Sequence, residues 1–318
     1  MTDLAVHDAA DDCPHAPGND PSFQESSLFV WHDLAAGIGG FWRLGQEPVI
    51  GELNSCFGVF TSGGQRFRCN VTGVPMGTGD RDETHMGWGA ALRVDLDTLS
   101  IRADFPDLQA SMRFMDFFPR YDWFRLLNRP AAPSHHFEVA GRMTGGIVIG
   151  GREIEFNALG YRDRSWGPRK WDGMRGTRWW PSVFGPDLCV FLTASLHEPN
   201  HYGSYGYMIR DGVPQTLANV DIGAMLDSDA ISPRAGVGRF AMPDGQFGEL
   251  HHERADGIVL HVRGYSAVES IGTVRWADRI GMSNLEVCTN PLGGNRPPIL
   301  TLGANNVDGI SWRLQGPR

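Results

Sequence analysis

The sequence predicts an all-β protein built from antiparallel barrels or sandwiches. Apolar residues recur mostly with a period of two, glycine-containing turns separate the apolar runs at about 8–12-residue intervals, and helix patterns are few. The 41 glycines and 20 prolines among 318 residues fit many short strands joined by tight turns. A chain of this length forms two domains or one large all-β unit.

The first half of the chain contains four clear strand patterns. Runs 56–60 and 66–71 are rich in strand-forming residues and flank a turn at 62–64. Runs 92–96 and 99–103 alternate apolar with polar or charged residues, which is typical of strands with one face in water. Antiparallel pairing is therefore expected here.

The second half continues the same pattern. Further strands are expected at 136–141, 146–150, 153–156, 176–184, 188–196, 204–210, 258–264, 271–281 and 308–313. Turns are expected at 150–151, 211–212 and 256–257, where glycine recurs. Two short helical segments are expected at 122–127 and 222–226.

A stretch with two prolines divides the chain. Residues 128–134 have no strand pattern and mark a domain boundary. The segment 1–25 is acidic and rich in Pro, Gly and Asn, so we expect a flexible tail there. The remainder forms an N-terminal β-domain over 26–132 and a C-terminal β-domain over 133–318.

The overall charge narrows the classes of partner. Lys and Arg number 28 and Asp and Glu 37, a net charge of −9, so no surface is expected that would neutralise the phosphates of nucleic acid or anionic lipid. No stretch approaches the roughly 18 apolar residues of a membrane span. The N-terminus lacks the features of a signal peptide, so a cytoplasmic protein is expected. The oligomeric state is not predicted.

The sequence predicts neither a metal nor a cofactor. Cysteines number 5 and include no C-x-x-C pair, which argues against a disulfide framework or a zinc cage. Residues 197–201 match H-E-x-x-H, but that zinc motif needs a helix, and the flanks 188–196 and 202–206 favour strand and turn. Dinucleotide-binding, Walker and serine-hydrolase motifs are absent.

The densest group of chemically active side chains spans residues 160–171 and continues at 178–180. A carboxylate such as Asp163 among indole rings is partly desolvated, which raises its pKa and lets it donate a proton, whereas neighbouring arginines lower the pKa. In the alternative interpretation, Asp163 forms ion pairs that hold a tight turn, and Trp166 fills a barrel end. The candidate partners are Arg162, Arg164 and Arg169.

A histidine pair lies upstream of this segment. His135 and His136 are adjacent on an expected strand, so one points inward and the other outward. An inward His136 would relay protons to or from Asp163. The alternative is a buried histidine whose hydrogen bonds are satisfied by its neighbours.

Aromatic residues elsewhere are candidates for the lining of a pocket. His85 and Trp88 would face a pocket in the first domain. Tyr205 and Tyr207 share one face of an expected strand and would line a pocket mouth. The alternative is that such aromatic side chains only fill barrel cores or cover a barrel surface.

The segment 160–169, Gly-Tyr-Arg-Asp-Arg-Ser-Trp-Gly-Pro-Arg, resembles the D-x-S-W-G-x-R block of a known superfamily. That superfamily contains AttH-like proteins and carotenoid 1,2-hydratases, and it includes fungal pericyclases of related fold. The resemblance implies two consecutive lipocalin-like β-barrel domains with an apolar pocket. For the carotenoid hydratases it implies that an aspartate protonates an alkene and water is added, helped by nearby Tyr, His and Trp.

Carried onto this sequence, the resemblance makes Asp163 the general acid. Tyr161, at the Tyr-x-Asp spacing, and His136 would tune or relay the proton. The family's His-x-Trp element is matched only at His136, because Glu138 stands where the family has tryptophan. The side chains expected to bind the substrate nearby are Trp166, Trp179, Trp180 and Arg162.

The sequence thus predicts a cofactor-independent enzyme that acts on an apolar, unsaturated metabolite by acid–base chemistry. A terpenoid, steroid or polyketide fits the aromatic content, and a hydratase or dehydratase is the most concrete form. Two alternatives stay open: a cyclase or isomerase whose pocket orders a reactive conformer, and a carrier that performs no chemistry. All three need an apolar cavity and a hydrophobic small-molecule partner.

Overall fold

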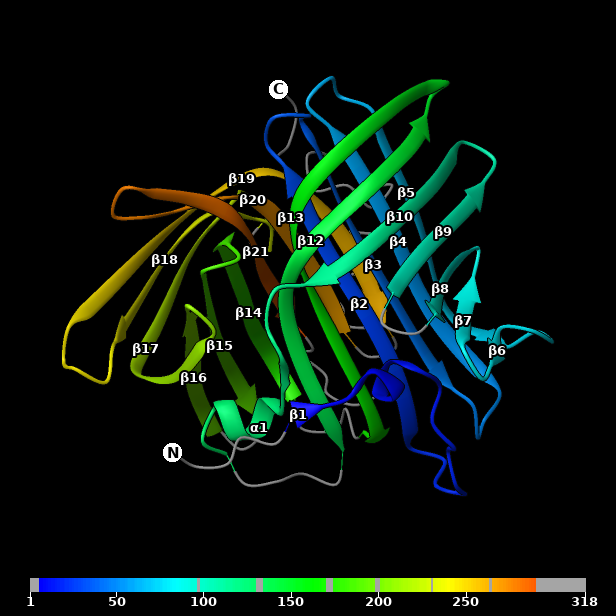
Figure 1. Cartoon of the computed structure of the whole chain (residues 1–318), viewed down its shortest axis with the longest axis horizontal. Coiled ribbons are helices and arrows are strands. Elements are labelled where there is room, and N and C mark those ends of the chain that lie inside the picture. Colours follow the sequence, from blue (N-terminus) through cyan, green and yellow to red (C-terminus); the bar gives the residue numbers. More distant parts are fainter. Residues whose placement is uncertain are drawn as a thin grey trace. The chain divides into compact units, whose positions relative to one another are not determined.

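The computed structural model describes residues 6–95, 98–129, 134–169, 174–197, 201–229, 231–262 and 265–289 (Figure 1). In this part of the chain nearly all regular structure is β-strand, as the sequence predicts. No helix among these residues is long and apolar enough to cross a membrane. The chain forms two compact units, Met1–Arg125 with Arg129–Arg169, and Leu126–Asn128 with Lys170–Arg318.

One 11-stranded antiparallel sheet makes up most of the first unit (Figure 1). In pairing order its strands are β5 (Arg66–Pro75), β4 (Glu52–Thr61), β3 (Ile38–Glu47), β2 (Phe23–Asp33), β13 (Arg152–Pro168), β12 (His135–Ile149), β10 (Leu108–Asp116), β9 (Thr98–Phe105), β8 (Ala90–Asp95), β7 (His85–Trp88) and β6 (Arg81–Asp82). The other elements are a strand pair, β1 (Val6–His7) with β11 (Arg120–Tyr121), a short 3-10 helix η1 (Ala9–Asp12) and the helical turn α1 (Trp123–Leu126).

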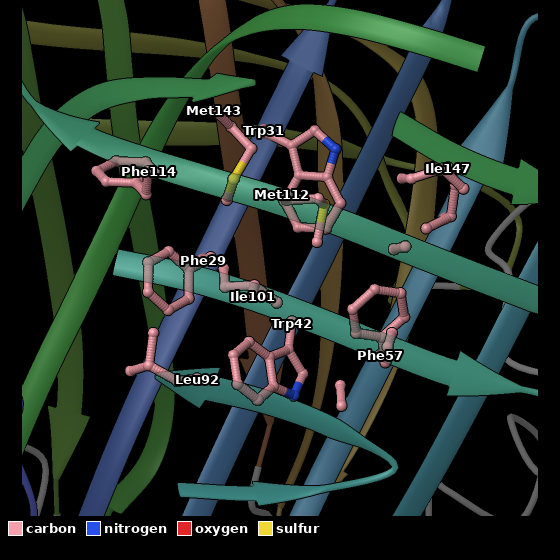
Figure 2. Packing of buried hydrophobic residues seen from close by; sticks show 14 of the residues in the cluster. Phe29, Trp31, Trp42, Phe57, Leu92, Ile101, Met112, Phe114, Met143 and Ile147 are labelled. Atoms are coloured by element: carbon pink, nitrogen blue, oxygen red, sulfur yellow. The ribbon is translucent and has the colours of Figure 1, made fainter. Parts of the chain in front are cut away.

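An aromatic core fills the inner side of this sheet. Figure 2 shows side chains from β2, β3 and β4 facing side chains from β8, β9, β10 and β12. Phe29 packs against Trp42 and Phe114, with ring centroids 5.9 and 5.5 Å apart. Strands β3 and β7 are distant in the strand order but contact each other, so the sheet curls around the core. Burying each large apolar side chain contributes roughly 1.5–3 kcal/mol.

Strands β8, β9 and β10 each have one solvent-exposed face, as the sequence predicts. Residues alternate between buried and exposed along β8, β9 and β10. The inward residues include Leu92, Ile101 and Met112, which belong to the core in Figure 2. The period-two pattern is therefore confirmed where it was clearest.

From residue 6 onward the N-terminal segment packs against the sheet, which corrects the expectation of a flexible tail over 1–25 for these described residues. Asp12 is 1% exposed, and its carboxylate accepts hydrogen bonds from Arg162 on β13 at 2.6 and 3.2 Å. Arg164 donates to two backbone carbonyls of the same segment. The acidic composition that favoured disorder supplies counter-charges and acceptors for arginines buried beneath the segment.

The first unit ends at Arg169, whereas the sequence places the boundary at 132/133. Strand pairing explains the difference. Strand β12 pairs with β10 and β13 pairs with β2, so both belong to the first sheet. A proline-rich connection can lie inside a domain as well as between domains, because long-range pairing decides where a sheet ends.

The second unit is a closed barrel of eight antiparallel strands (Figure 1). Consecutive strands pair around it: β14 (Met174–Gly185), β15 (Leu188–His197), β16 (His201–Arg210), β17 (Val213–Leu226), β18 (Pro233–Ala241), β19 (Phe247–Val262), β20 (Tyr265–Trp276) and β21 (Arg279–Thr289). Trp180 belongs to its apolar core. The ring nitrogens of buried His252 contact the hydroxyls of Ser270 and Ser283 at 3.0 and 2.7 Å, so this imidazole is satisfied structurally.

Two local predictions are wrong. The helix expected at 222–226 is the end of β17, which pairs with β18. The turn expected at 256–257 lies inside β19, where a bulge between Arg254 and Asp256 lets the strand continue past the glycine. In both places the long-range pairing of the strand overrides the local preference.

Other local predictions are confirmed. The helical turn expected at 122–127 is α1, and turns occur at 150–151 and 211–212. The H-E-x-x-H match begins at the end of β15 and ends at the start of β16, so its flanks are strands and not a helix. Its central residues 198–200 and the strand expected at 308–313 lie outside the described residues.

Candidate active site

Strands β12 and β13 bring three ionisable side chains together on one face of the first unit's sheet. Glu138 on β12 lies directly opposite Asp163 on β13, and His136 lies opposite Ser165. Residues opposite each other in an antiparallel pair point to the same side, as do residues two apart along a strand. His136, Glu138 and Asp163 therefore share a face, and Tyr161 shares it with them.

His136 lies between two carboxylates. Its Nε2 is 2.8 Å from Asp163 Oδ2 and 3.2 Å from Glu138 Oε1. The other oxygen of Glu138, Oε2, accepts a hydrogen bond from the Tyr161 hydroxyl at 2.7 Å. The Glu138 side chain is 0% exposed and that of Asp163 is 17% exposed. Asp163 is thus the more exposed of the two carboxylates.

This arrangement keeps a proton on the histidine. Burial alone would lower the pKa of His136, but the charges of Asp163 and Glu138 and the hydrogen bonds to them raise the pKa to about 9. Burial would raise the pKa of Asp163, but the charge and hydrogen bond of His136 hold it below the usual 3.8. At neutral pH the cluster therefore contains an imidazolium ion and an ionised Asp163.

The raised pKa of His136 makes stability depend on pH. The folded pKa lies above the ordinary value of 6.5, so the charge stabilises the fold fully below pH 6.5 and is lost as pH rises through about 9. We expect the free energy of unfolding, measured by urea denaturation, to fall over this interval. The His136→Gln variant lacks the imidazole that titrates in this interval and should show a smaller fall. An equal fall in both proteins would contradict the assignment.

An indole ring covers the imidazole of His136. Trp123 in α1 stacks on it with ring centroids 4.6 Å apart and planes at 27°. The face of an indole attracts a cation, so this contact favours the charged histidine. The superfamily resemblance implies a tryptophan two residues after the histidine. Here Glu138 holds that position, and the stacking tryptophan comes from a different element.

Arg162, predicted to bind substrate, lies on the other face of β13 from Asp163. Neighbouring residues of a strand point to opposite sides, so adjacency in sequence separated these two side chains. The Arg162 guanidinium donates to Asp12 and to Asp116, where Nε is 2.7 Å from Oδ1. Burial lowers the pKa of Arg162, but these two carboxylates outweigh it and raise the pKa. Arg162 therefore holds the N-terminal segment.

Trp166, also predicted to bind substrate, shares that opposite face. It is 7% exposed and is stacked between His15 and His135, with ring centroids 4.0 and 5.0 Å away. His15 comes from the N-terminal segment and His135 from β12. The indole thus packs the N-terminal segment onto the sheet and does not face Asp163.

The other predicted pocket residues lie on strands other than β12 and β13. In the first unit, His85 and Trp88 are on β7, and Trp88 packs against the aromatic core. In the second unit, Trp180 is in the barrel core. Trp179 and Tyr207 both contact the ring of Phe191, and Tyr205 lies on the same strand as Tyr207. Within the first unit the structure therefore gathers Asp163, Tyr161 and His136 and leaves out the other predicted site residues.

The cluster also has the composition of a metal site. One ligand atom from each of His136, Glu138 and Asp163 lies within 4.8 Å of the other two. Imidazole and carboxylates suit divalent transition metals. A metal ion would need the Nε2 lone pair, whereas here Nε2 hydrogen-bonds to Asp163 Oδ2. A metal ion would therefore have to displace the proton at His136 Nε2.

A cleft of about 680 Å³ opens elsewhere in the first unit. It is bordered by β1, β9, β10 and β12, and its lining includes Arg113, Asp116 and Arg142. Neither Asp163 nor His136 lines it. Its lining combines these charged side chains with apolar ones such as Leu99 and Phe114.

Comparison with known proteins places the chain in a family. Residues 8–291 match the family described as "Domain of unknown function (DUF7064)". The chain belongs to the DUF7064 family. No curated protein sequence matches it significantly.

Solved structures show the fold of this DUF7064 chain in other proteins. A putative AttH from Nitrosomonas europaea matches with a TM-score of 0.63 and 12% identity, covering 92% of this chain and 99% of that protein. CghA, solved with Sch210972, matches with a TM-score of 0.60 and 12% identity, covering 85% of this chain and 89% of that protein. Kievitone hydratase from Nectria haematococca matches with a TM-score of 0.55 and 8% identity, covering 91% of this chain and 94% of that protein. The DUF7064 chain thus has the lipocalin-like β fold of AttH-like proteins, as the segment 160–169 predicts.

Two members of the cluster in this DUF7064 chain were not predicted from sequence. Glu138 was noted only as a departure from the His-x-Trp element. Its place two residues after His136 on an expected strand is the signal that would have put both side chains on one face. Trp123 has no comparable signal, because its contact with His136 depends on how α1 packs against β12.

Proposed function

We propose that this chain is an acid–base enzyme that adds water to, or removes water from, an unsaturated small molecule. The observation that carries the proposal is the 2.8 Å hydrogen bond between His136 Nε2 and Asp163 Oδ2. Moving one proton along this bond converts imidazolium and carboxylate into neutral imidazole and carboxylic acid. Asp163 then exchanges that proton with the substrate.

Hydration by this pair leaves the enzyme unchanged. Asp163 delivers a proton to one alkene carbon, and water forms a bond to the other. The added water releases a proton, which returns through Asp163 to His136. Glu138, which accepts the hydrogen bond of the Tyr161 hydroxyl, stays negative and stabilises the imidazolium. Dehydration is the same sequence reversed.

The fold supports this proposal in general terms. One protein of similar structure is named kievitone hydratase. A fold does not determine a reaction, so the proposal depends on the cluster. A terpenoid, steroid or polyketide remains the proposed kind of substrate.

Isotopic labelling tests the proposed reaction. The protein is incubated in deuterated water with a panel of terpenoid, steroid and polyketide alkenes and their hydrated counterparts, and the products are analysed by mass spectrometry. We expect gain or loss of one water, with deuterium bound to carbon, and neither with the Asp163→Asn variant. A rearranged product of unchanged formula without deuterium would favour a cyclase or isomerase. A bound compound that is always recovered unchanged would favour a carrier.

A further inference from the structure

A second charged side chain lies on the same face of the sheet as Asp163. Asp163 on β13 is opposite Leu28 on β2, and Leu28 is opposite Arg43 on β3. These three side chains therefore form one row across the sheet. Neighbouring strands are about 4.8 Å apart, which separates the Cα atoms of Asp163 and Arg43 by roughly 10 Å.

Arg43 is buried without a hydrogen-bond partner at its terminal nitrogens. The residue is 4% exposed, and neither Nη1 nor Nη2 has a partner among the described residues. Gln24 on β2 is also 4% exposed, and both polar atoms of its amide lack partners there. Most buried polar side-chain atoms in native proteins are hydrogen-bonded, so two such side chains call for an explanation.

Arg43 and Gln24 converge above a glycine. Gly45 follows Arg43 by two residues on β3 and therefore lies on the same face. A Cβ at position 45 would lie 2.8 Å from Arg43 Nη1 and 3.1 Å from Gln24 Nε2. Opposite Gly45, the hydroxyls of Ser26 and Ser165 pair with each other at 2.9 Å. The two unpaired donors thus converge directly over Gly45, where a β-carbon would collide with the guanidinium.

The neighbours of Arg43 do not satisfy its charge. Asp163 attracts it electrostatically but accepts no hydrogen bond from its terminal nitrogens. A guanidinium carries five N–H donors, so turning the Gln24 amide over to offer its oxygen would still leave donors open. A buried charge without partners is strongly unfavourable. A ligand that supplies the missing acceptor explains why an arginine stands here.

We propose that Arg43 and Gln24 bind an oxygen anion of the substrate, either a carboxylate or the enolate of a conjugated carbonyl. This inference rests on the proposed acid–base function and specifies its substrate class: an alkene conjugated to a carbonyl or carboxyl group, not a hydrocarbon. The alkene then lies over Leu28, between Asp163 and Arg43. A guanidinium holds a carboxylate through two parallel hydrogen bonds.

The same placement explains how a weak acid protonates carbon. Water bonds to the β-carbon of the conjugated alkene, and the electron pair moves to the carbonyl oxygen. Arg43 stabilises the negative charge that develops there. Asp163 then protonates the α-carbon, and the proton lost by the added water returns to His136 through Asp163. An enolate accepts a proton from a far weaker acid than an isolated alkene does.

Binding measurements test this assignment without turnover. The probes are cinnamate and cinnamyl alcohol, which share an alkene and a ring and differ in the oxygen group, and affinity is measured by calorimetry. We expect the wild type to bind cinnamate at least about tenfold more tightly, because hydrogen bonds to charged groups contribute that much. The Arg43→Met variant should lose the preference. The control Arg93→Met, which removes an exposed arginine on β8, should keep it.

The melting temperature of Arg43→Met and the binding preference of a second variant test whether Arg43 has only a structural role. If Arg43 serves a ligand, Arg43→Met should melt at the wild-type temperature or above, since it removes an unpaired buried charge. Gly45→Ala keeps the charge, but its methyl group would displace the Arg43 guanidinium and the Gln24 amide, so it should weaken cinnamate more than cinnamyl alcohol. An unchanged preference in both variants, or no preference in the wild type, would overturn the assignment. If the wild type prefers cinnamate to cinnamyl alcohol but places no deuterium on carbon in the labelling test, the acid–base function is refuted instead.

Discussion

The Asp163→Asn variant is expected to turn over substrate about 10²–10⁴-fold more slowly than the wild type, the usual contribution of a general acid or base. Asparagine keeps the size of the side chain but cannot take up a proton from His136 and pass it on. Its amide oxygen can still accept the hydrogen bond from His136 Nε2, so the fold should be retained. The measurement is the initial rate with the substrate found by labelling, together with the melting temperature.

Two further variants complete this test. Asp107→Asn, in the exposed turn between β9 and β10, should keep full activity. His136→Gln should lower the rate and remove the part of the pH profile that follows histidine titration, because His136 acts through Asp163. If Asp163→Asn loses its fold along with its activity, Asp163 is a structural ion-pair partner and the catalytic account fails.

The Arg162→Ala variant should have the largest effect on stability. Arg162 is 1% exposed and contacts the carboxylates of Asp12 and Asp116. Breaking a buried ion pair by removing one partner typically costs about 3–5 kcal/mol. Arg120 also contacts both carboxylates, so we expect the lower end, about 3 kcal/mol of unfolding free energy. Urea denaturation measures the loss.

An exposed ion pair provides the control for Arg162. Arg239 pairs with Glu249 on the surface of the barrel, where its side chain is 63% exposed. Surface pairs contribute little, so Arg239→Ala should leave stability almost unchanged. If Arg162→Ala were equally mild, the N-terminal segment would not depend on this arginine, and the corrected view of residues 6–25 would need another explanation.

The β architecture could be predicted because it depends on local patterns. Alternation along β8 to β10 and glycine turns such as 150–151 are visible in the sequence. The domain boundary could not be predicted from the sequence, because it depends on the pairing of β13 with β2. No local pattern shows which distant strands pair. The prediction of a flexible N-terminal tail was wrong for a related reason. Its acidic residues are solvating when alone and become ion-pair partners beside the arginines of β13.

Only the parts of the candidate site that depend on short sequence spacings could be predicted. Tyr161 and Asp163 are two residues apart, and the resemblance supplied His136. Arg162 and Trp166 were assigned to the same site because they are adjacent in sequence, although alternation along a strand places them on the opposite face. Arg43 could not be found from sequence, since its relation to Asp163 crosses two strands.

The proposed chemistry depends on a proton that His136 holds between Asp163 and Glu138. Nitrogen-15 NMR of the imidazole, followed as a function of pH, measures this directly. We expect His136 to titrate at about 9 in the wild type. Its pKa should fall in both Asp163→Asn and Glu138→Gln, because each variant removes one negative charge. A His136 that titrates at or below 6.5 in the folded wild type would contradict the account.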